Sequence, residues 1–175
     1  MPIRFVLKDV EERNILDDNA FDIFEPTVGL LIEGKDVLQE NDIDDIRNVV
    51  VMHFIESALK VTKRMVNELA QTLEGDYSYW FLGTGFGIKA KRHGMTLELM
   101  LEIDPRMGPL SSSELSRKNK NLANVSIKDW VGAVISLSKE LNSLFYRVHR
   151  GLEAIHKQEK HRLILEKWLD SAPDT

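Results

Sequence analysis

Three closely spaced glycines are the first candidate for a functional site in this 175-residue chain. Gly83, Gly85 and Gly87 resemble the glycines of a nucleotide-binding loop. Such a loop needs a helix directly after it, because the first amides of that helix hold the phosphate. Here the residues after Gly87 alternate as in a strand, and the lysine–serine pair of a P-loop is missing. We therefore interpret residues 83–87 as a turn or bulge between two strands.

Histidines and carboxylates at helical spacing give a second candidate. His149, Glu153 and His156 fall within about 60° of one another on a helix, so they can converge on a metal ion. His53 and Glu56 show the reverse order on another expected helix. No third or fourth carboxylate-bearing helix is evident, and we interpret these residues as polar helix faces. We expect no metal and no cofactor.

Two carboxylates on one expected strand face give a third candidate. Glu98 and Glu102 have the spacing of a paired-carboxylate site, but cross-strand pairing with Lys89 and Lys91 explains them more simply. His161 lies in a run of mixed charge, and we interpret it as solvated. No grouping of serine, histidine and acid can be assembled from the spacing. We expect no catalytic residue.

Charge is unevenly distributed along the chain. The net charge is −5, whereas residues 1–45 contain 13 Asp and Glu against four Lys and Arg, a net −9, which leaves +4 for the rest. An acidic end of this kind repels nucleic acid and attracts a basic partner. The alternative is a solvated acidic face that keeps the protein soluble. The basic residues from 147 to 167 are interleaved with glutamates, so we do not expect nucleic-acid binding.

Length and composition indicate one soluble domain. Hydrophobic residues make up 43% of the chain and charged residues 29%, which are ordinary values for a globular protein. No apolar run approaches the roughly 20 residues that span a bilayer, and no secretory signal precedes the first strand-like segment. The absence of cysteine excludes disulfides and thiolate chemistry. We expect a cytoplasmic protein without membrane contact.

A β-hairpin is the structural centre of the expected fold. Phe86, Ile88 and Ala90 alternate with polar residues, and an alternating apolar set recurs over residues 95–103. Pairing Ala90 with Met95 around a turn at residues 91–94 puts both apolar sets on one face. Further strands are expected at residues 3–8, 27–33 and 77–82, with a turn at residues 34–36 and a short return strand at residues 37–39.

Helical periodicity predicts the covering layer. One long helix is expected over residues 41–74, ended by Gly75, and a second over residues 127–150, with Ser126 at its N-terminus. Residues 105–125 lack a pattern and predict a mobile loop, and residues 152–170 predict a protruding C-terminal helix. The whole is a single α+β domain: an antiparallel sheet of about four to six strands with two long helices packed on one face.

This layout resembles that of the small immunity proteins encoded beside polymorphic or contact-dependent inhibition toxins of bacteria. The resemblance spans roughly residues 27–150 and rests on LLIEGKDVL, the long helix after it, YWFLGTGFGI with MTLELMLEI, and VSIKDWV with its helix. It implies a cytoplasmic protein without catalysis of its own. Such a protein binds one cognate toxin domain, often a nuclease, and occludes its active site.

The acidic N-terminal third gives the expected partner-binding surface, because complementary charge speeds encounter and selects a partner. It consists of Asp17, Asp18, Asp22, Asp42, Asp44 and Asp45, with the loop at residues 105–125 as second choice. One alternative is a small-molecule- or metal-binding domain, or an enzyme, with a pocket between the sheet and the helices. Another is a homodimer formed through the apolar group at residues 163–169.

Overall fold

Antiparallel sheets and long helices make up the described part of the chain. In a computed structural model, that part covers residues 2–8, 27–41, 51–81, 85–104, 106, 118–147 and 152–172. One sheet has the strand order β1-β2-β3 and the other β4-β5-β6-β7. The strands are β1 (Ile3–Lys8), β2 (Thr27–Ile32), β3 (Lys35–Asp36), β4 (Glu74–Phe81), β5 (Phe86–His93), β6 (Thr96–Ile103) and β7 (Asn121–Ser126). The helices are η1 (Gln39–Asn41), α2 (Val51–Glu68), α4 (Ile127–Arg147) and α5 (Leu152–Ser171).

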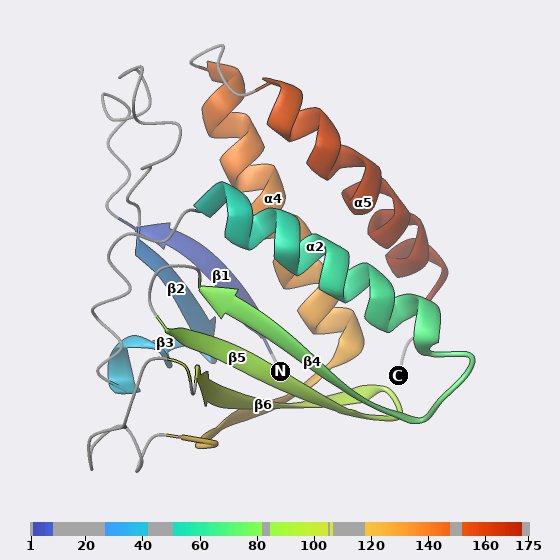
Figure 1. Ribbon diagram of the computed structural model, residues 1–175. Coiled ribbons are helices and arrows are strands. Elements are labelled where there is room, and N and C mark those ends of the chain that lie inside the picture. Colours follow the sequence, from blue (N-terminus) through green and yellow to red (C-terminus); the bar gives the residue numbers. More distant parts are fainter. Residues whose placement is uncertain are drawn as a thin grey trace.

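The helices stack in two layers over the strands. Helix α2 packs against β4, and α4 packs against β1 and β7. Helix α5 lies on α2 and α4 and is the outermost helix in Figure 1. The α+β class is confirmed, although the strands form two sheets and a third long helix joins the two expected ones. No helix in the described ranges is long and apolar enough to span a membrane.

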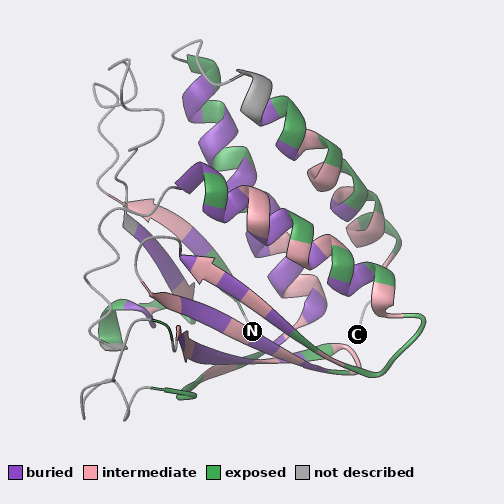
Figure 2. Ribbon diagram, viewed as in Figure 1, coloured by how far each residue is buried: buried purple, intermediate pink, exposed green. Residues whose placement is uncertain are grey.

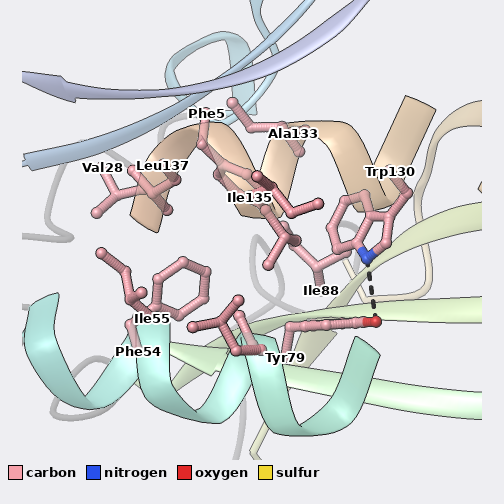
Figure 3. Close-up of a cluster of buried hydrophobic side chains, with 14 of the residues drawn as sticks. Phe5, Val28, Phe54, Ile55, Tyr79, Ile88, Trp130, Ala133, Ile135 and Leu137 are labelled. Carbon is pink, nitrogen blue, oxygen red and sulfur yellow. Dashed lines mark hydrogen bonds between the residues drawn. The ribbon is translucent and has the colours of Figure 1, made fainter. Parts of the chain in front are cut away.

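Aromatic side chains from four elements fill the centre of the core. Phe54 stacks on Phe81 at 4.6 Å between ring centroids, and Phe5 meets the edge of Trp130 at 5.4 Å. The indole N–H of Trp130 donates a hydrogen bond to the Tyr79 hydroxyl at 3.0 Å (Figure 3). Buried residues gather on the inward faces of α2 and α4, whereas much of α5 is exposed (Figure 2). This core joins both sheets to the two inner helices.

The β5–β6 hairpin forms with a register different from the expected one. Ala90 pairs with Leu99, not Met95, and the strands continue to the pair His93 and Thr96. The expected turn at residues 91–94 was wrong, because the connection is the two residues 94 and 95, and Gly94 takes a φ of 62° that glycine adopts without strain. The shift is an even number of residues, so the apolar sets still share one face.

Arg92 is the residue that this register moves into the interior. Its exposed fraction is 1%, and its Nη2 donates hydrogen bonds to Thr72 Oγ1 at 2.5 Å and to the Glu74 carbonyl at 3.2 Å. The sequence pattern assigned it to an exposed turn. A buried arginine held by a hydroxyl and a carbonyl fixes the start of β4 against the end of β5.

Helix α2 ends earlier than expected. Its last residue is Glu68, and the chain turns through residues 69–71 before β4 begins at Glu74. Gly75 therefore lies inside a strand, opposite Arg92, and does not end the helix. Leu73 was counted in the buried stripe, but its exposed fraction is 76%. The expected first turns of this helix, residues 42–50, lie outside the described residues.

The first sheet also has an earlier turn than expected. Glu33 and Gly34 form it, both with positive φ, and the short return strand is Lys35–Asp36. The expected return strand at residues 37–39 was wrong, because Asp36 Oδ1 accepts a hydrogen bond from Leu38 N at 3.1 Å and the chain turns into η1. Such aspartate-to-backbone bonds favour a turn over a continuing strand.

Helix α4 begins as the sequence predicts. Ser126 Oγ accepts a hydrogen bond from the backbone N–H of Asp129 at 3.0 Å, which satisfies a free amide of the first turn. The expected end at residue 150 lies outside the described residues, and the described helix ends at Arg147.

Helix α5 was expected to protrude, and in the structure it lies against α2 and α4. Ile155, Gln158 and Leu165 are buried there. The apolar group proposed for dimerisation divides between the two sides of the helix. Leu165 is buried, Trp168 and Leu169 pack partly against the core, and Leu163 and Ile164 are exposed.

Candidate functional site

The expected acidic surface lies outside the described residues, but the points where its two segments join the fold are described. All six aspartates, Asp17, Asp18, Asp22, Asp42, Asp44 and Asp45, belong to residues 9–26 or 42–50. The first segment joins β1 to β2, and the second follows η1. Both segments therefore connect to the three-stranded sheet and the turn that follows it.

Side-chain contacts tie these connection points together. The Lys8 ammonium, at the end of β1, forms an ion pair with Asp36 and donates a hydrogen bond to Gln39 Oε1 at 3.4 Å. The Lys8 and Asp36 side chains pass over Gly29, where an added Cβ would lie 2.6 Å from Asp36 Oδ2. The last described residue before the first acidic segment is thus linked to η1, which precedes the second.

Other sequence candidates are only partly described. Gly83 and Thr84 lie outside the described residues, while Gly85 has a φ of 73° immediately before β5. The glycine-rich stretch is therefore followed by a strand, as the turn interpretation requires. In the loop expected at residues 105–125, the described residues 121–125 belong to β7.

The histidine–glutamate groupings form no metal cluster among the described residues. His149 and the side chain of Glu153 lie outside them. His156 is exposed, and its Nδ1 lies 3.1 Å from Glu159. On α2, Glu56 forms an ion pair with Lys60 at 2.5 Å, and His53 is exposed.

The expected cross-strand pairing of the strand carboxylates is found in part. Lys89 forms an ion pair with Asp76 of β4 at 2.8 Å, and Glu98 accepts a hydrogen bond from Asn121 of β7 at 3.1 Å. Lys91 stands directly opposite Glu98 in the register. Neighbouring strands on both sides of the hairpin therefore supply partners for Lys89 and Glu98. Glu102 lies opposite Gly87, and its buried Oε2 has no hydrogen-bond partner among the described residues.

A groove between α2 and α5 is the site that sequence reasoning missed. It is an open groove of about 410 Å³, within the range of about 300–1,000 Å³ that small-molecule sites occupy. Its lining combines cations, amides, one carboxylate and one imidazole: Lys60, Lys63, Arg64, Asn67, Glu68, Gln71 and His161. The expected pocket between sheet and helices is a different place, because the described core packs there.

Helical spacing gathers most of this lining on one face of α2. Lys63 and Arg64 follow Lys60 by three and four residues, and Asn67 continues the row. The opposite face of α2 holds the buried Leu59, Thr62, Met65 and Val66, so the cations must point away from the core. Helix α5 runs in the same direction as α2 (Figure 1), since Gln158 reaches Met52 and His161 lies farther along, at the cations.

The charges in the groove are unequally satisfied. Glu68 accepts a hydrogen bond from the Tyr77 hydroxyl at 2.8 Å and lies 3.7 Å from Arg64 Nε, so its charge is already engaged. Lys60 is paired with Glu56. Lys63 has no ion pair with any residue in the described ranges. The lining residues include three cations and one carboxylate, and Lys63 is the cation without an ion pair among the described residues.

His161 reports this positive field. Burial and the neighbouring Lys63 and Lys60 lower the pKa of the His161 imidazole, while Glu56 opposes them. Its Nδ1 is buried and has no hydrogen-bond partner among the described residues. The ring is therefore held neutral at neutral pH, with one nitrogen unused.

The sequence pattern that corresponds to this groove is common and therefore not specific. Cations at three- and four-residue steps occur on many solvated helix faces, and His161 lies in a polar run. Only the packing of α5 along α2, which joins residues about 100 positions apart, turns two polar faces into one concave site.

Comparison of the chain with protein-family models, with curated proteins and with solved structures gave no match.

Proposed function

We propose that this chain is a non-enzymatic protein-binding module of the immunity-protein kind, which binds a cognate toxin domain and neutralises it by covering its active site. The observation that carries the proposal is the segregation of charge. Residues 1–45 have a net charge of −9, in a chain whose remaining residues sum to +4. A basic enzyme surface, such as that of a nuclease, is the natural complement of such a segment.

The way in which the acidic segments join the fold supports the proposal. Residues 9–26 are held at both ends by paired strands, since Lys8 pairs with Thr27 in the register of β1 and β2. Both strands contribute to the core through Phe5, Val28 and Leu30. A binding segment anchored on a rigid sheet loses less conformational entropy on complex formation than a free tail does.

Charge reversal in the acidic set tests the proposal. Changing Asp44→Lys and Asp45→Lys together should slow association with the toxin domain encoded by the neighbouring gene by about tenfold or more at low salt, because long-range attraction mainly sets the association rate. Surface plasmon resonance at two salt concentrations measures this effect.

The matched control reverses two exposed acids elsewhere. Glu140→Lys with Asp170→Lys makes the same change in net charge on α4 and α5. This control should affect the association rate less. If the Asp44 and Asp45 variant binds as tightly and as fast as the unchanged chain, the acidic segment is not the contact surface.

A further inference from the structure

We propose that the groove between α2 and α5 is a binding site for a small soluble compound bearing two or more phosphate groups. This site is separate from the acidic segments and does not depend on the toxin-binding proposal. The two proposals concern opposite charges: an acidic surface for a basic protein, and a basic groove for a small anion.

The chemistry of the lining favours phosphate over other ligands. Lys63 has no ion pair among the described residues, Lys60 lies three residues before it, and Arg64 follows it directly. Ammonium and guanidinium groups form short, charge-assisted hydrogen bonds with phosphate oxygens. Asn67 adds a side-chain amide, which can donate to an oxygen that the cations leave free. Three cations along about one turn of helix match a diphosphate better than a single carboxylate.

The opposite wall adds an imidazole that responds to a bound anion. His161 comes from α5 and lines the groove, but its Nδ1 is closed off from solvent, so the ring acts on the anion through charge and not through that nitrogen. Burial, followed by Lys63 and Lys60, lowers the pKa of this imidazole, and an anion in the groove offsets the part that the two lysines contribute. Glu56, Lys60 and Lys63 of α2 are the charged groups that act on this ring. Binding should therefore be tighter at mildly acidic pH than at alkaline pH.

The existing carboxylates do not block the site. Glu68 is engaged by Tyr77 and Arg64, and the side chain of Arg64 lies over the Tyr77 ring at 5.3 Å. Glu56 pairs with Lys60 at 2.5 Å, and this pair lowers the pKa of the Glu56 carboxyl. A ligand that displaces Glu56 from Lys60 exchanges one exposed ion pair for another. The exchange leaves the partly exposed Glu56 carboxylate to water, and Lys63 has no competing ion pair among the described residues.

Titration with inorganic pyrophosphate at fixed ionic strength tests the site on the full chain. Two-dimensional NMR should show saturable shifts that concentrate at residues 60–71 and at His161. The variant Lys60→Gln with Lys63→Gln should weaken this binding roughly tenfold, from the loss of two partly exposed charge contacts. Both side chains lie on the outer face of α2, and circular dichroism and thermal unfolding verify that the variant folds.

A charge-matched control separates a site from general attraction. Lys35→Gln with Lys118→Gln removes the same charge from two exposed lysines outside the groove. This control should bind pyrophosphate as the unchanged chain does. The proposal is overturned if shifts are absent, if they spread evenly over the surface, or if the two double variants bind equally.

ADP in a parallel titration distinguishes a nucleotide from a free polyphosphate. Binding of either compound that is lost in the groove variant and kept in the control supports the site, and tighter binding of ADP identifies a nucleotide. Binding of neither compound at millimolar concentration overturns it. At fixed ionic strength, so that salt screening stays constant, a saturable rise in the His161 pKa, followed by its ring proton shifts, reports occupancy of the groove.

Discussion

Three polar side chains from three elements form a hydrogen-bonded chain inside the core. The Trp130 indole of α4 donates to the Tyr79 hydroxyl of β4 at 3.0 Å, and this hydroxyl lies 3.2 Å from Thr62 Oγ1 of α2. Burial raises the pKa of Tyr79 to about 12, so the phenol stays protonated at neutral pH and can donate to Thr62. Each polar atom has a partner, which is what makes their burial tolerable.

Removing this hydroxyl tests its role. Tyr79→Phe should lower the free energy of unfolding by about 1–3 kcal/mol, because it leaves the buried Trp130 N–H without an acceptor. Urea denaturation followed by Trp fluorescence measures the change. Tyr146→Phe is the matched control, since Tyr146 is an exposed residue whose hydroxyl donates to Glu159. Equal losses in the two variants would contradict the assigned role of Tyr79.

For individual residues, the sequence predicts which side chains are buried better than it predicts their hydrogen-bond partners. Period-two alternation placed Ile88, Leu97 and Leu99 in the core correctly. It could not show that Arg92 enters the interior, because a charged residue at the end of an alternating run looks like a turn residue. Its partners, Thr72 and the Glu74 carbonyl, lie about 20 residues away in the chain.

Glycines in strands and helices have different effects on the elements. In β5, Gly87 lies opposite Trp80, and an added Cβ would stand 2.8 Å from Trp80 Cε3 and 2.9 Å from the Tyr79 carbonyl oxygen. In α4, Gly132 has nothing within 4 Å of an added Cβ. One glycine permits close packing between strands, whereas the other leaves the helix backbone without its usual side chain.

Alanine substitution at these positions should therefore have opposite effects. Gly87→Ala should destabilise the chain by about 1–3 kcal/mol through overpacking. Gly132→Ala should stabilise it by about 0.5–1 kcal/mol, because alanine loses less backbone entropy in a helix. Chemical denaturation of both variants gives the comparison. Destabilisation of similar size in both would mean that the close approach at Gly87 is not limiting.

Elements with strong periodicity are predictable from this sequence, and their ends are less so. Helix α4, with Ser126 as its cap, follows directly from pattern and capping chemistry. The hairpin register does not, because turns at residues 91–94 and at residues 94–95 both keep the apolar faces together. The two registers differ in the partner of Arg92. In the structure Arg92 pairs with Leu97 across the strands, which fixes the shorter turn.

Helix α5 packs against the other helices although part of its sequence is polar on all sides. Residues 156–162 are polar all round, yet Gln158 is 1% exposed and its Nε2 lies 3.5 Å from the Met52 carbonyl oxygen. Arg162 lies near Glu159 at 3.6 Å and Glu166 at 3.7 Å, and Lys139 of α4 pairs with Glu166 at 2.8 Å. Of these contacts, Gln158 to Met52 and Lys139 to Glu166 cross the interface of α5, beside the buried Ile155 and Leu165, whereas those of Arg162 lie within the helix. An apolar stripe is too narrow a criterion for predicting such packing.

For the whole molecule, charge is divided between an acidic first 45 residues and a groove between α2 and α5 that is lined by three cations. We proposed a basic protein partner for the first and a small anion for the second. The first of these charge features is readable from composition alone. The second needs the tertiary structure, because its walls come from two helices far apart in the chain.

The central claim, that this chain neutralises a toxin domain, is tested most directly by purifying the product of the neighbouring gene and titrating its toxic activity with the purified chain. At toxin concentrations well above the dissociation constant, activity should fall linearly and vanish at one equivalent, as expected for a one-to-one protein that covers an active site. Full toxin activity in the presence of excess folded chain would contradict the account.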